Sequence, residues 1–280
     1  MSKKTGVCFF LILSCAFCSI ADSFAYDFKP CAPQTSSQSG KSLKLVFCSL
    51  NYPDPADFAK DREVLIQRLK RTRPFDEFTD VIKVWKIGLL DKKEAELSFK
   101  KIEEYPFLNV HRDFLERIFN FVNSNYKLII IDASGSISAA QLSSAHATSL
   151  IILGRARYRN KESFANGFLH ELGHSLGLRD EGLNEHASRC SPGYPNCATT
   201  KEEARQWWGD LVLREKFVGY INGCCGNKDY IRPTIASFMN DPDQANDFGP
   251  VNERYLRIIL MEAKDNIASK NDRNLPLHAS

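Results

Sequence analysis

The chain has 280 residues, of which 43% are hydrophobic and 25% are charged, so it can bury a sizeable core in one or two lobes. The formal net charge is only +3, which gives no reason to expect a nucleic acid or an anionic membrane surface as a partner. No internal repeat and no low-complexity tract is visible in the sequence.

Residues 1–25 are typical of a secretory signal peptide. Two lysines precede an apolar run, and the preferred cleavage site follows Ala25. The run is short and contains Ser and Cys, which disfavours a membrane anchor, and the residues before Cys15 and Cys18 fit a lipoprotein site poorly. We therefore expect export to the periplasm or the outside, without stable membrane insertion after cleavage.

The region that follows alternates predicted strands with amphipathic helices. Strands are predicted at 42–50, 81–89, 126–131 and 148–155, and helices at 55–71 and 108–122. Asp54 is a suitable N-cap for the first helix, and we interpret His111 and His146 as structural. The pattern does not decide whether residues 148–155 form an edge or a central strand. The alternation predicts an α/β fold in which helices pack on a mixed, twisted, mostly parallel sheet.

Beyond residue 181 the pattern becomes irregular. A loop-rich stretch precedes a predicted helix at 201–217, whose Trp207 and Trp208 we interpret as packing residues, and a final helix is predicted at 251–268. We therefore expect residues 26–181 to form an N-terminal lobe, and residues 182–280 to form a loop-rich C-terminal lobe that ends in a helix.

The strongest functional pattern lies where these two lobes meet. His170, Glu171 and His174 form an HExxH motif. On a helix the two histidines project from one face, Glu171 lies about 100° round the axis, and apolar residues occupy the opposite face. Two imidazoles beside a carboxylate are the arrangement that a zinc hydrolase needs.

A third ligand is expected shortly after this helix. Gly177 can adopt a positive φ, which ends the helix and turns the chain back towards its ligand face. Asp180 then falls ten residues after His170, where it can reach the same metal. Glu181 and His186 are the alternatives for this third position.

Six cysteines remain after the signal peptide: Cys31, Cys48, Cys190, Cys197, Cys224 and Cys225. An even number in an exported chain favours disulfide bonds. Cys190 and Cys197 close a short loop and are the natural partners, whereas a bond between the neighbours Cys224 and Cys225 would be strained. Cys31 or Cys48 could instead be a thiol that caps the metal, but a disulfide is the simpler interpretation.

The motif and the sequence around it resemble a known clan of peptidases. HExxHxxGxxD is similar to the zinc-binding signature of the metzincin peptidases. The segments that resemble one metzincin-like family, which includes an immunoglobulin A-cleaving peptidase, are Tyr194–Cys197, Trp207–Trp208, Tyr230–Pro233, Met239 and Phe248–Glu253. That family has one more residue before the Asp, and a Tyr where this chain has Gly182. The resemblance covers roughly residues 126 to 260 and implies no immunoglobulin specificity.

This resemblance implies a metzincin-like zincin fold and a methionine turn under the metal, for which Met239 is the candidate. The expected function is that of a zinc endopeptidase on protein or peptide substrates, working as a monomer. Zn²⁺ held by the two histidines and Asp180 would activate water, and Glu171 would act as general base. Tyr230 could donate a hydrogen bond to the oxyanion, although packing explains it equally well.

Two other classes of function remain open. One is a zinc amidase that acts on a non-protein substrate, and the other is a catalytically idle, secreted binding module of the same fold. An idle copy has no physical need of Glu171, which argues against the second class. No Gly-rich phosphate loop follows a predicted strand, so nothing in the sequence indicates a nucleotide enzyme.

Overall fold

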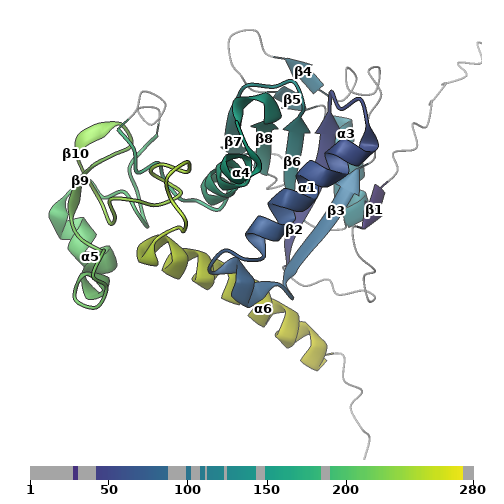
Figure 1. Ribbon diagram of the computed structural model, residues 1–280. Coiled ribbons are helices and arrows are strands. Elements are labelled where there is room, and N and C mark those ends of the chain that lie inside the picture. Colours follow the sequence, from purple (N-terminus) through teal and green to yellow (C-terminus); the bar gives the residue numbers. More distant parts are fainter. Residues whose placement is uncertain are drawn as a thin grey trace, which may run out of the picture.

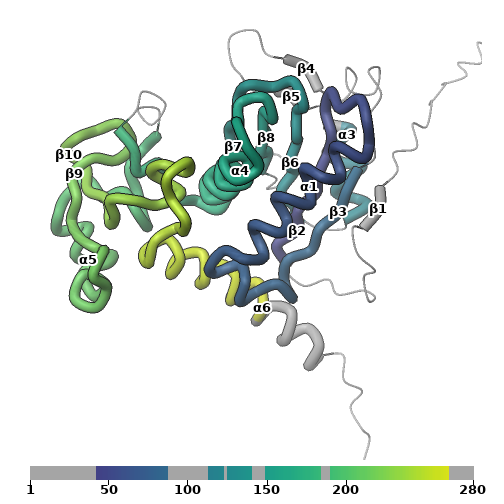
Figure 2. The backbone as a smooth tube through the Cα atoms, viewed as in Figure 1, coloured from purple at the N-terminus to yellow at the C-terminus, as the bar shows by residue number. Residues whose placement is uncertain are grey.

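A computed structural model describes residues 28–30, 42–87, 99–101, 108–110, 112–122, 125–142, 149–183 and 190–273 (Figure 1), and Figure 2 traces the same backbone. The expected signal peptide, Cys31, His111, His146 and His186 lie outside these residues.

The centre of the molecule is a six-stranded sheet in the order β1-β3-β2-β6-β8-β7. Its strands are β1 Phe28–Pro30, β2 Leu43–Leu50, β3 Ile82–Ile87, β6 Lys127–Asp132, β7 Ser138–Leu142 and β8 Ser149–Gly154. The four inner strands β3, β2, β6 and β8 are parallel, and β1 and β7 pair antiparallel at the two edges. The predicted mixed, mostly parallel sheet is confirmed.

Helices cover both faces of this sheet. Helices α1 (Pro55–Leu69) and α4 (Lys161–Ser175) pack on one face of the sheet, in one apolar cluster with the strand side chains of that face. Helix α3 (Arg112–Val122) packs on the opposite face, in a second apolar cluster. The period-two alternation is clear in β2, where Leu45 and Phe47 face α1 and α4 while Val46 and Cys48 face α3. Because both faces are covered, all eight residues of β2 are buried, including Lys44 and Ser49.

Short elements join these layers. They are the 3-10 turns η1 (Phe75–Phe78) and η2 (Arg155–Arg157) and the antiparallel pair β4 (Phe99–Lys101) and β5 (Leu108–Val110). We call residues 28–181 the sheet region.

We call residues 182–273 the loop-rich region, and the part of it that precedes residue 250 lies on the left of Figure 1. Its elements are α5 (Lys201–Val212), the hairpin β9 (Ile221–Cys224) with β10 (Asn227–Arg232), and α6 (Pro250–Arg273). Trp208 is fully buried and donates from Nε1 to the Gly219 carbonyl at 2.9 Å, which confirms its packing role. Helix α6 runs back beneath the sheet region, where Arg257 pairs with Glu77 of η1 at 2.6 Å.

The strand predicted at residues 148–155 is present as β8, and it is internal because strand β7, which was not predicted, occupies the edge beside it. Two other predictions about elements need correction. Residues 108–110 form β5, which pairs with β4, so the helix predicted from 108 begins only at Arg112. Helix α5 ends at Val212 rather than at residue 217.

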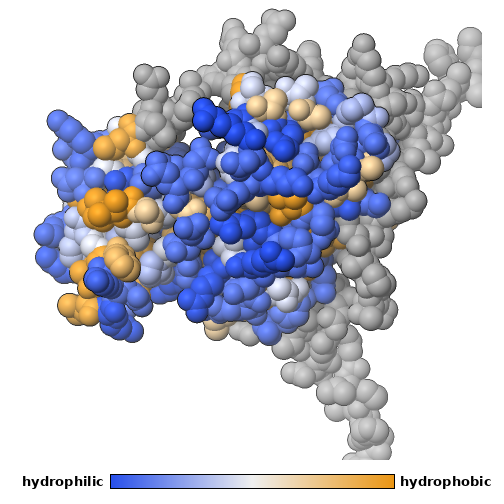
Figure 3. Space-filling view, viewed as in Figure 1, coloured by the Kyte–Doolittle hydropathy of each residue, from blue (hydrophilic) through white to orange (hydrophobic). Residues whose placement is uncertain are grey.

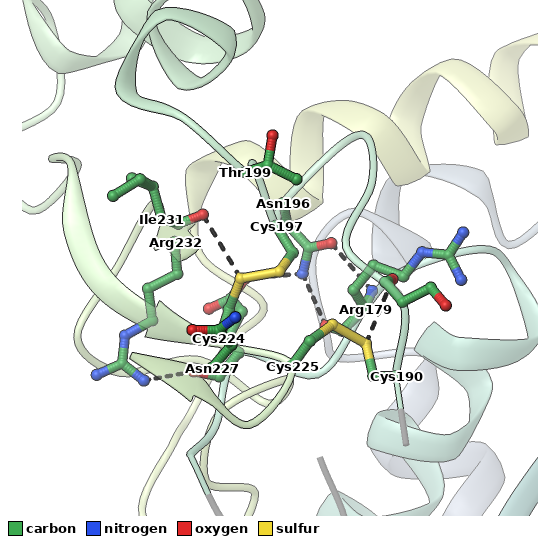
Figure 4. Close-up of a disulfide and its surroundings, with 12 residues drawn as sticks. Arg179, Cys190, Asn196, Cys197, Thr199, Cys224, Cys225, Asn227, Ile231 and Arg232 are labelled. Atoms are coloured by element: carbon green, nitrogen blue, oxygen red, sulfur yellow. Dashed lines mark hydrogen bonds between the residues drawn. A yellow bond between two sulfur atoms is a disulfide. The ribbon is translucent and has the colours of Figure 1, made fainter. Parts of the chain in front are cut away.

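The predicted Cys190–Cys197 disulfide is wrong. Cys190 bonds Cys225 and Cys197 bonds Cys224 (Figure 4). Cys224 and Cys225 lie at the tip of the β9–β10 hairpin, where the turn directs neighbouring side chains to different partners. Two backbone hydrogen bonds between Gly193 and Cys197 close the short loop instead of a disulfide.

Cys48 is not in a disulfide. Its thiol is free and fully buried against the α3 face of the sheet, where burial raises its pKa. A buried, protonated thiol of this kind does not support the alternative that Cys48 caps a metal.

Two disulfides among the described residues are consistent with an oxidising compartment. Among the same residues, none of the helices combines the length and the apolar character that crossing a bilayer requires.

Candidate metal centre

Helix α4 places the HExxH motif against the sheet. Asn160 caps its first turn by accepting the Ser163 N–H at 2.8 Å. Phe164, Phe168 and Leu172 are fully buried in the cluster that α4 shares with the sheet, so their face of the helix is fixed by apolar packing. The predicted apolar back of this helix is therefore present in the structure.

The end of α4 turns the chain back towards the motif. Lys127 of β6 donates to the carbonyl of Ser175 at 2.6 Å, so a cation lies at the C-terminal end of the helix, where the dipole favours it. Gly177 follows with φ +104°, a conformation that other residues rarely adopt. The reversal brings Asp180 back to the ligand face of the helix.

Three potential ligand atoms converge there. The Nε2 atoms of His170 and His174 lie 3.0 Å apart, and Oδ1 of Asp180 lies 3.4 Å and 3.3 Å from them. Ligands at about 2.0–2.1 Å from a tetrahedral zinc ion are about 3.3 Å from one another. The spacing of the three atoms therefore fits one zinc ion, and their chemistry fits zinc as well.

Backbone carbonyls fix the orientation of both imidazoles. Nδ1 of His170 lies 2.7 Å from the Phe238 carbonyl, and Nδ1 of His174 lies 3.0 Å from the Leu178 carbonyl. A carbonyl only accepts, so each Nδ1 carries the hydrogen and donates it. In the neutral tautomer each Nε2 then has its lone pair free for a metal.

Without a metal, the pKa values of the two histidines shift in opposite directions. Burial, together with the neighbouring His174, lowers the pKa of His170 to about 4. Burial also lowers the pKa of His174, but the hydrogen bond and negative charge of Asp180 outweigh it and raise that pKa to about 9. Of the two histidines, only His174 is therefore protonated at neutral pH when no metal is bound.

Glu171 lies beside these ligands and is nearly inaccessible to solvent, with 7% of its surface exposed. Burial is the main cause that raises its pKa, to about 7. The backbone N–H of Ala140, in the edge strand β7, donates to the carboxylate and opposes this rise. A carboxylate that titrates near neutrality is suited to take up and release a proton.

Met239 lies under α4. Residues 237–240 form a tight turn, in which the Asn240 N–H donates to the Ser237 carbonyl at 3.0 Å. A Cβ added to Gly173 would lie 2.5 Å from Sδ of Met239, so the absence of a side chain at Gly173 lets the sulfur approach the helix. The same turn presents the Phe238 carbonyl that orients His170, which links the turn to the ligands.

Two other candidates lie elsewhere. Tyr230 packs against the disulfides, in a small buried cluster with Cys197, Cys224 and Cys225. Glu181 is fully buried and its carboxylate oxygens accept hydrogen bonds from the loop-rich region, so it does not join the three ligands. The sequence suggested Glu181 only as a possible ligand, and no sequence signal indicated the hydrogen bond from Ala140.

No protein-family model matches this chain, and no curated protein matches it. Among solved structures, the chain is similar to archaemetzincin from Methanopyrus kandleri, with 15% sequence identity and a TM-score of 0.30. The match covers 51% of this chain and 78% of the other. The resemblance to the family of the immunoglobulin A-cleaving peptidase stays a prediction.

Proposed function

We propose that this protein is an exported zinc-dependent endopeptidase. The observation that carries the proposal is the convergence of His170, His174 and Asp180 on one point, with the carboxylate of Glu171 beside them. A chance surface cluster would not need both Nδ1 atoms bonded to carbonyls so that both Nε2 atoms face the same carboxylate oxygen.

The donor set suits zinc better than the harder divalent cations. Two imidazole nitrogens and one carboxylate oxygen are a three-ligand set of the kind found in catalytic zinc sites, whereas magnesium and calcium prefer oxygen ligands only. When bound, zinc would lower the pKa of a coordinated water towards neutral and polarise a peptide carbonyl.

The residues of the chain then supply the proton transfers. Burial gives Glu171 a pKa near 7 in the metal-free site, and a bound cation would lower that pKa, so the group would be ionised at neutral pH and able to accept a proton. Its burial between α4 and β7 keeps the carboxylate close to the ligands, and the Ala140 N–H holds its orientation. The same group can then deliver the proton to the amine that leaves the cleaved peptide bond.

The remaining parts of the proposal rest on sequence and on the disulfides. The predicted signal peptide and the two disulfides support export, and the resemblance to metzincins supports peptide substrates and a Met-turn role for Met239. We also propose a boundary between two lobes after Glu181, and a monomeric protein. An oxyanion contact from Tyr230 stays a prediction, because its ring packs on the disulfides.

The test compares three proteins that begin at Tyr26: the wild type, Glu171→Gln, and Glu162→Gln as a matched control. Glu162 is exposed in the first turn of the same helix and touches no ligand. Each is incubated with a mixed-sequence peptide library, and mass spectrometry reads the cleaved bonds while the zinc content is measured in the same samples.

We expect cleavage by the wild type and the control, and a loss of about a thousandfold or more in the zinc-loaded Glu171→Gln variant. Bound zinc without cleavage of any peptide would favour the zinc amidase or the idle binding module. The absence of stoichiometric zinc from the wild type would refute the metal centre itself.

A further inference from the structure

The carboxylate of Glu181 is the most heavily hydrogen-bonded buried side chain near the site. None of its surface is exposed. Oε1 accepts from Nδ2 of Asn196 at 2.9 Å and from Nδ2 of Asn252 at 2.8 Å. Oε2 accepts from Oγ of Ser237 at 2.7 Å and from Oγ1 of Thr234 at 3.3 Å. All four donors satisfy a carboxylate better than they would satisfy a neutral acid.

These donors come from three separate segments of the loop-rich region. Asn196 lies in the disulfide-bonded loop, Thr234 and Ser237 lead into the turn of Met239, and Asn252 lies in the first turn of α6. One carboxylate therefore joins the last residue of the sheet region to three separate segments of the loop-rich region.

The backbone around Asp180 is held by the same groups. The amide of Asn196 bonds both the N–H and the carbonyl of Arg179, each at 2.9 Å, as Figure 4 shows in part. The carbonyl of Asp180 accepts from the Cys225 N–H at 2.9 Å. Both chain neighbours of Asp180 are thus fixed: Asn196 holds the backbone of Arg179, and the hydrogen bonds of its own side chain hold Glu181.

Glu181 also reaches the carbonyl that orients His170. Its N–H donates to the Met239 carbonyl at 2.7 Å, and its carboxylate holds Ser237, which immediately precedes Phe238. The Phe238 carbonyl in turn accepts from Nδ1 of His170. One residue therefore contacts the segments on both sides of the metal centre, without contacting the ligand atoms.

The physical cost of this arrangement argues for a specific role. Removing a carboxylate from water is expensive, and an apolar side chain of similar volume often stabilises a buried site as well or better. A carboxylate is favoured where several donors must be held in one fixed arrangement. Groups that orient metal ligands in this way typically change metal affinity by 10–100-fold when they are removed.

We propose that Glu181 is a positioning residue of the metal centre, which locks Asp180 and the Phe238 carbonyl into the arrangement that binds the metal. The inference rests on the proposed zinc site, but it concerns metal affinity and geometry rather than peptidase activity. Glu181 is not a catalytic residue, because it touches neither the ligand atoms nor Glu171.

The experiment compares wild type, Glu181→Ala and Glu181→Gln, with Glu253→Gln as the control. Glu253 is a partly buried carboxylate in the first turn of α6, next to Asn252 but outside the network. Zinc affinity is measured by competition with a chromogenic chelator, and the visible spectrum of the Co²⁺ form reports ligand geometry. Thermal unfolding of the metal-free proteins is measured in parallel.

We expect Glu181→Ala to weaken zinc binding by 10–100-fold and to change the Co²⁺ spectrum at a temperature where the variant is folded. Glu181→Gln should recover most of the affinity, because its carbonyl can face Asn196 and Asn252. Its amide would then face the hydroxyls of Ser237 and Thr234, which can turn to accept. Glu253→Gln should bind zinc as the wild type does.

A second measurement covers the case in which Glu181→Ala does not fold. Ser237→Ala removes one hydrogen bond to the carboxylate and should weaken zinc binding several-fold. In the Glu181→Gln background the same substitution should weaken zinc binding less than it does in the wild type. Unchanged zinc affinity and Co²⁺ spectra in the folded variants, with only a lower Tm, would overturn the inference. If the wild type itself binds no zinc, the proposed metal centre fails, and this inference fails with it.

Discussion

The sheet region and the loop-rich region are held together by different forces. The sheet region buries apolar side chains on both faces of its strands, in two large clusters. The loop-rich region contributes Phe238, Met239, Phe248 and residues of α6 to the first of these clusters, and it adds a smaller apolar cluster of its own, two disulfides and the hydrogen bonds of Glu181. Most of the large apolar side chains that are exposed among the described residues follow residue 181, including Leu213, Phe217 and Ile235, and Figure 3 shows hydrophobic areas over this part of the molecule.

The metal centre draws on both kinds of stabilisation. Apolar packing of α4 fixes the two histidines, and apolar packing needs only approximate shapes to do so. The position of Asp180 and the orientation of His170 depend on hydrogen bonds from the loop-rich region, which have strict geometry. Substitutions can therefore disturb the fold and the geometry of the site separately.

The largest effect is expected from breaking the sheet region. Phe168 is fully buried and lies against Phe47, with ring centroids 6.0 Å apart. Phe168→Ala should lower the free energy of unfolding by about 3–5 kcal/mol through lost burial and a cavity. Denaturant unfolding followed by circular dichroism measures this. Phe217→Ala, at an exposed aromatic of the loop-rich region, should change it by about 0.5 kcal/mol or less.

A smaller and more local effect is expected from opening the loop-rich region. Replacing Cys197 and Cys224 together by Ala removes a disulfide between segments 27 residues apart, at an expected cost of about 2–4 kcal/mol. Because β9 and β10 have few apolar contacts to replace it, amide hydrogen exchange should accelerate there and not in β2 or β6. If hydrogen exchange accelerated equally in both regions, they would unfold as one unit, and the disulfide would not act locally.

The sequence predicted the sheet region better than the loop-rich region, for a physical reason. Strands β2, β6 and β8 are buried on both faces and therefore each contain a short unbroken apolar run, which a sequence pattern reveals directly. Strand β7, with the sequence SAAQL, has little intrinsic strand preference and is defined by its pairing with β8. Such pairing depends on tertiary structure, so the local sequence of a strand does not reveal it.

The site divides in the same way. The sequence indicated His170, His174 and Asp180 as neighbours, because helix geometry places the two histidines on one face and Gly177 allows the chain to turn back towards it. The role of Glu181 as a buried acceptor and the Cys190–Cys225 pairing depend on segments far apart in the chain. Hydrogen-bond donors such as Asn196 and Asn252 carry no sequence signal that would connect them to an acidic residue.

The smallest effect concerns the proton that the metal-free centre holds. Because Asp180 keeps His174 protonated below about pH 9, zinc must displace that proton, so zinc affinity should rise about tenfold per pH unit between roughly pH 7.5 and 9 and level off above. The raised pKa also contributes stability to the metal-free protein, which is fully present below about pH 6.5 and is lost as the pH rises through about 9.

Calorimetry in buffers of different ionisation enthalpy can count that proton. In the Glu171→Gln background, which removes the other group that titrates near neutrality, about one proton should be released per zinc at pH 7.5. Asp180→Asn removes the charge that raises the pKa of His174, so proton release should fall towards zero while zinc binding weakens. Release that persists in the Asn variant would mean that the hydrogen bond with the Leu178 carbonyl, rather than the charge of Asp180, keeps His174 protonated.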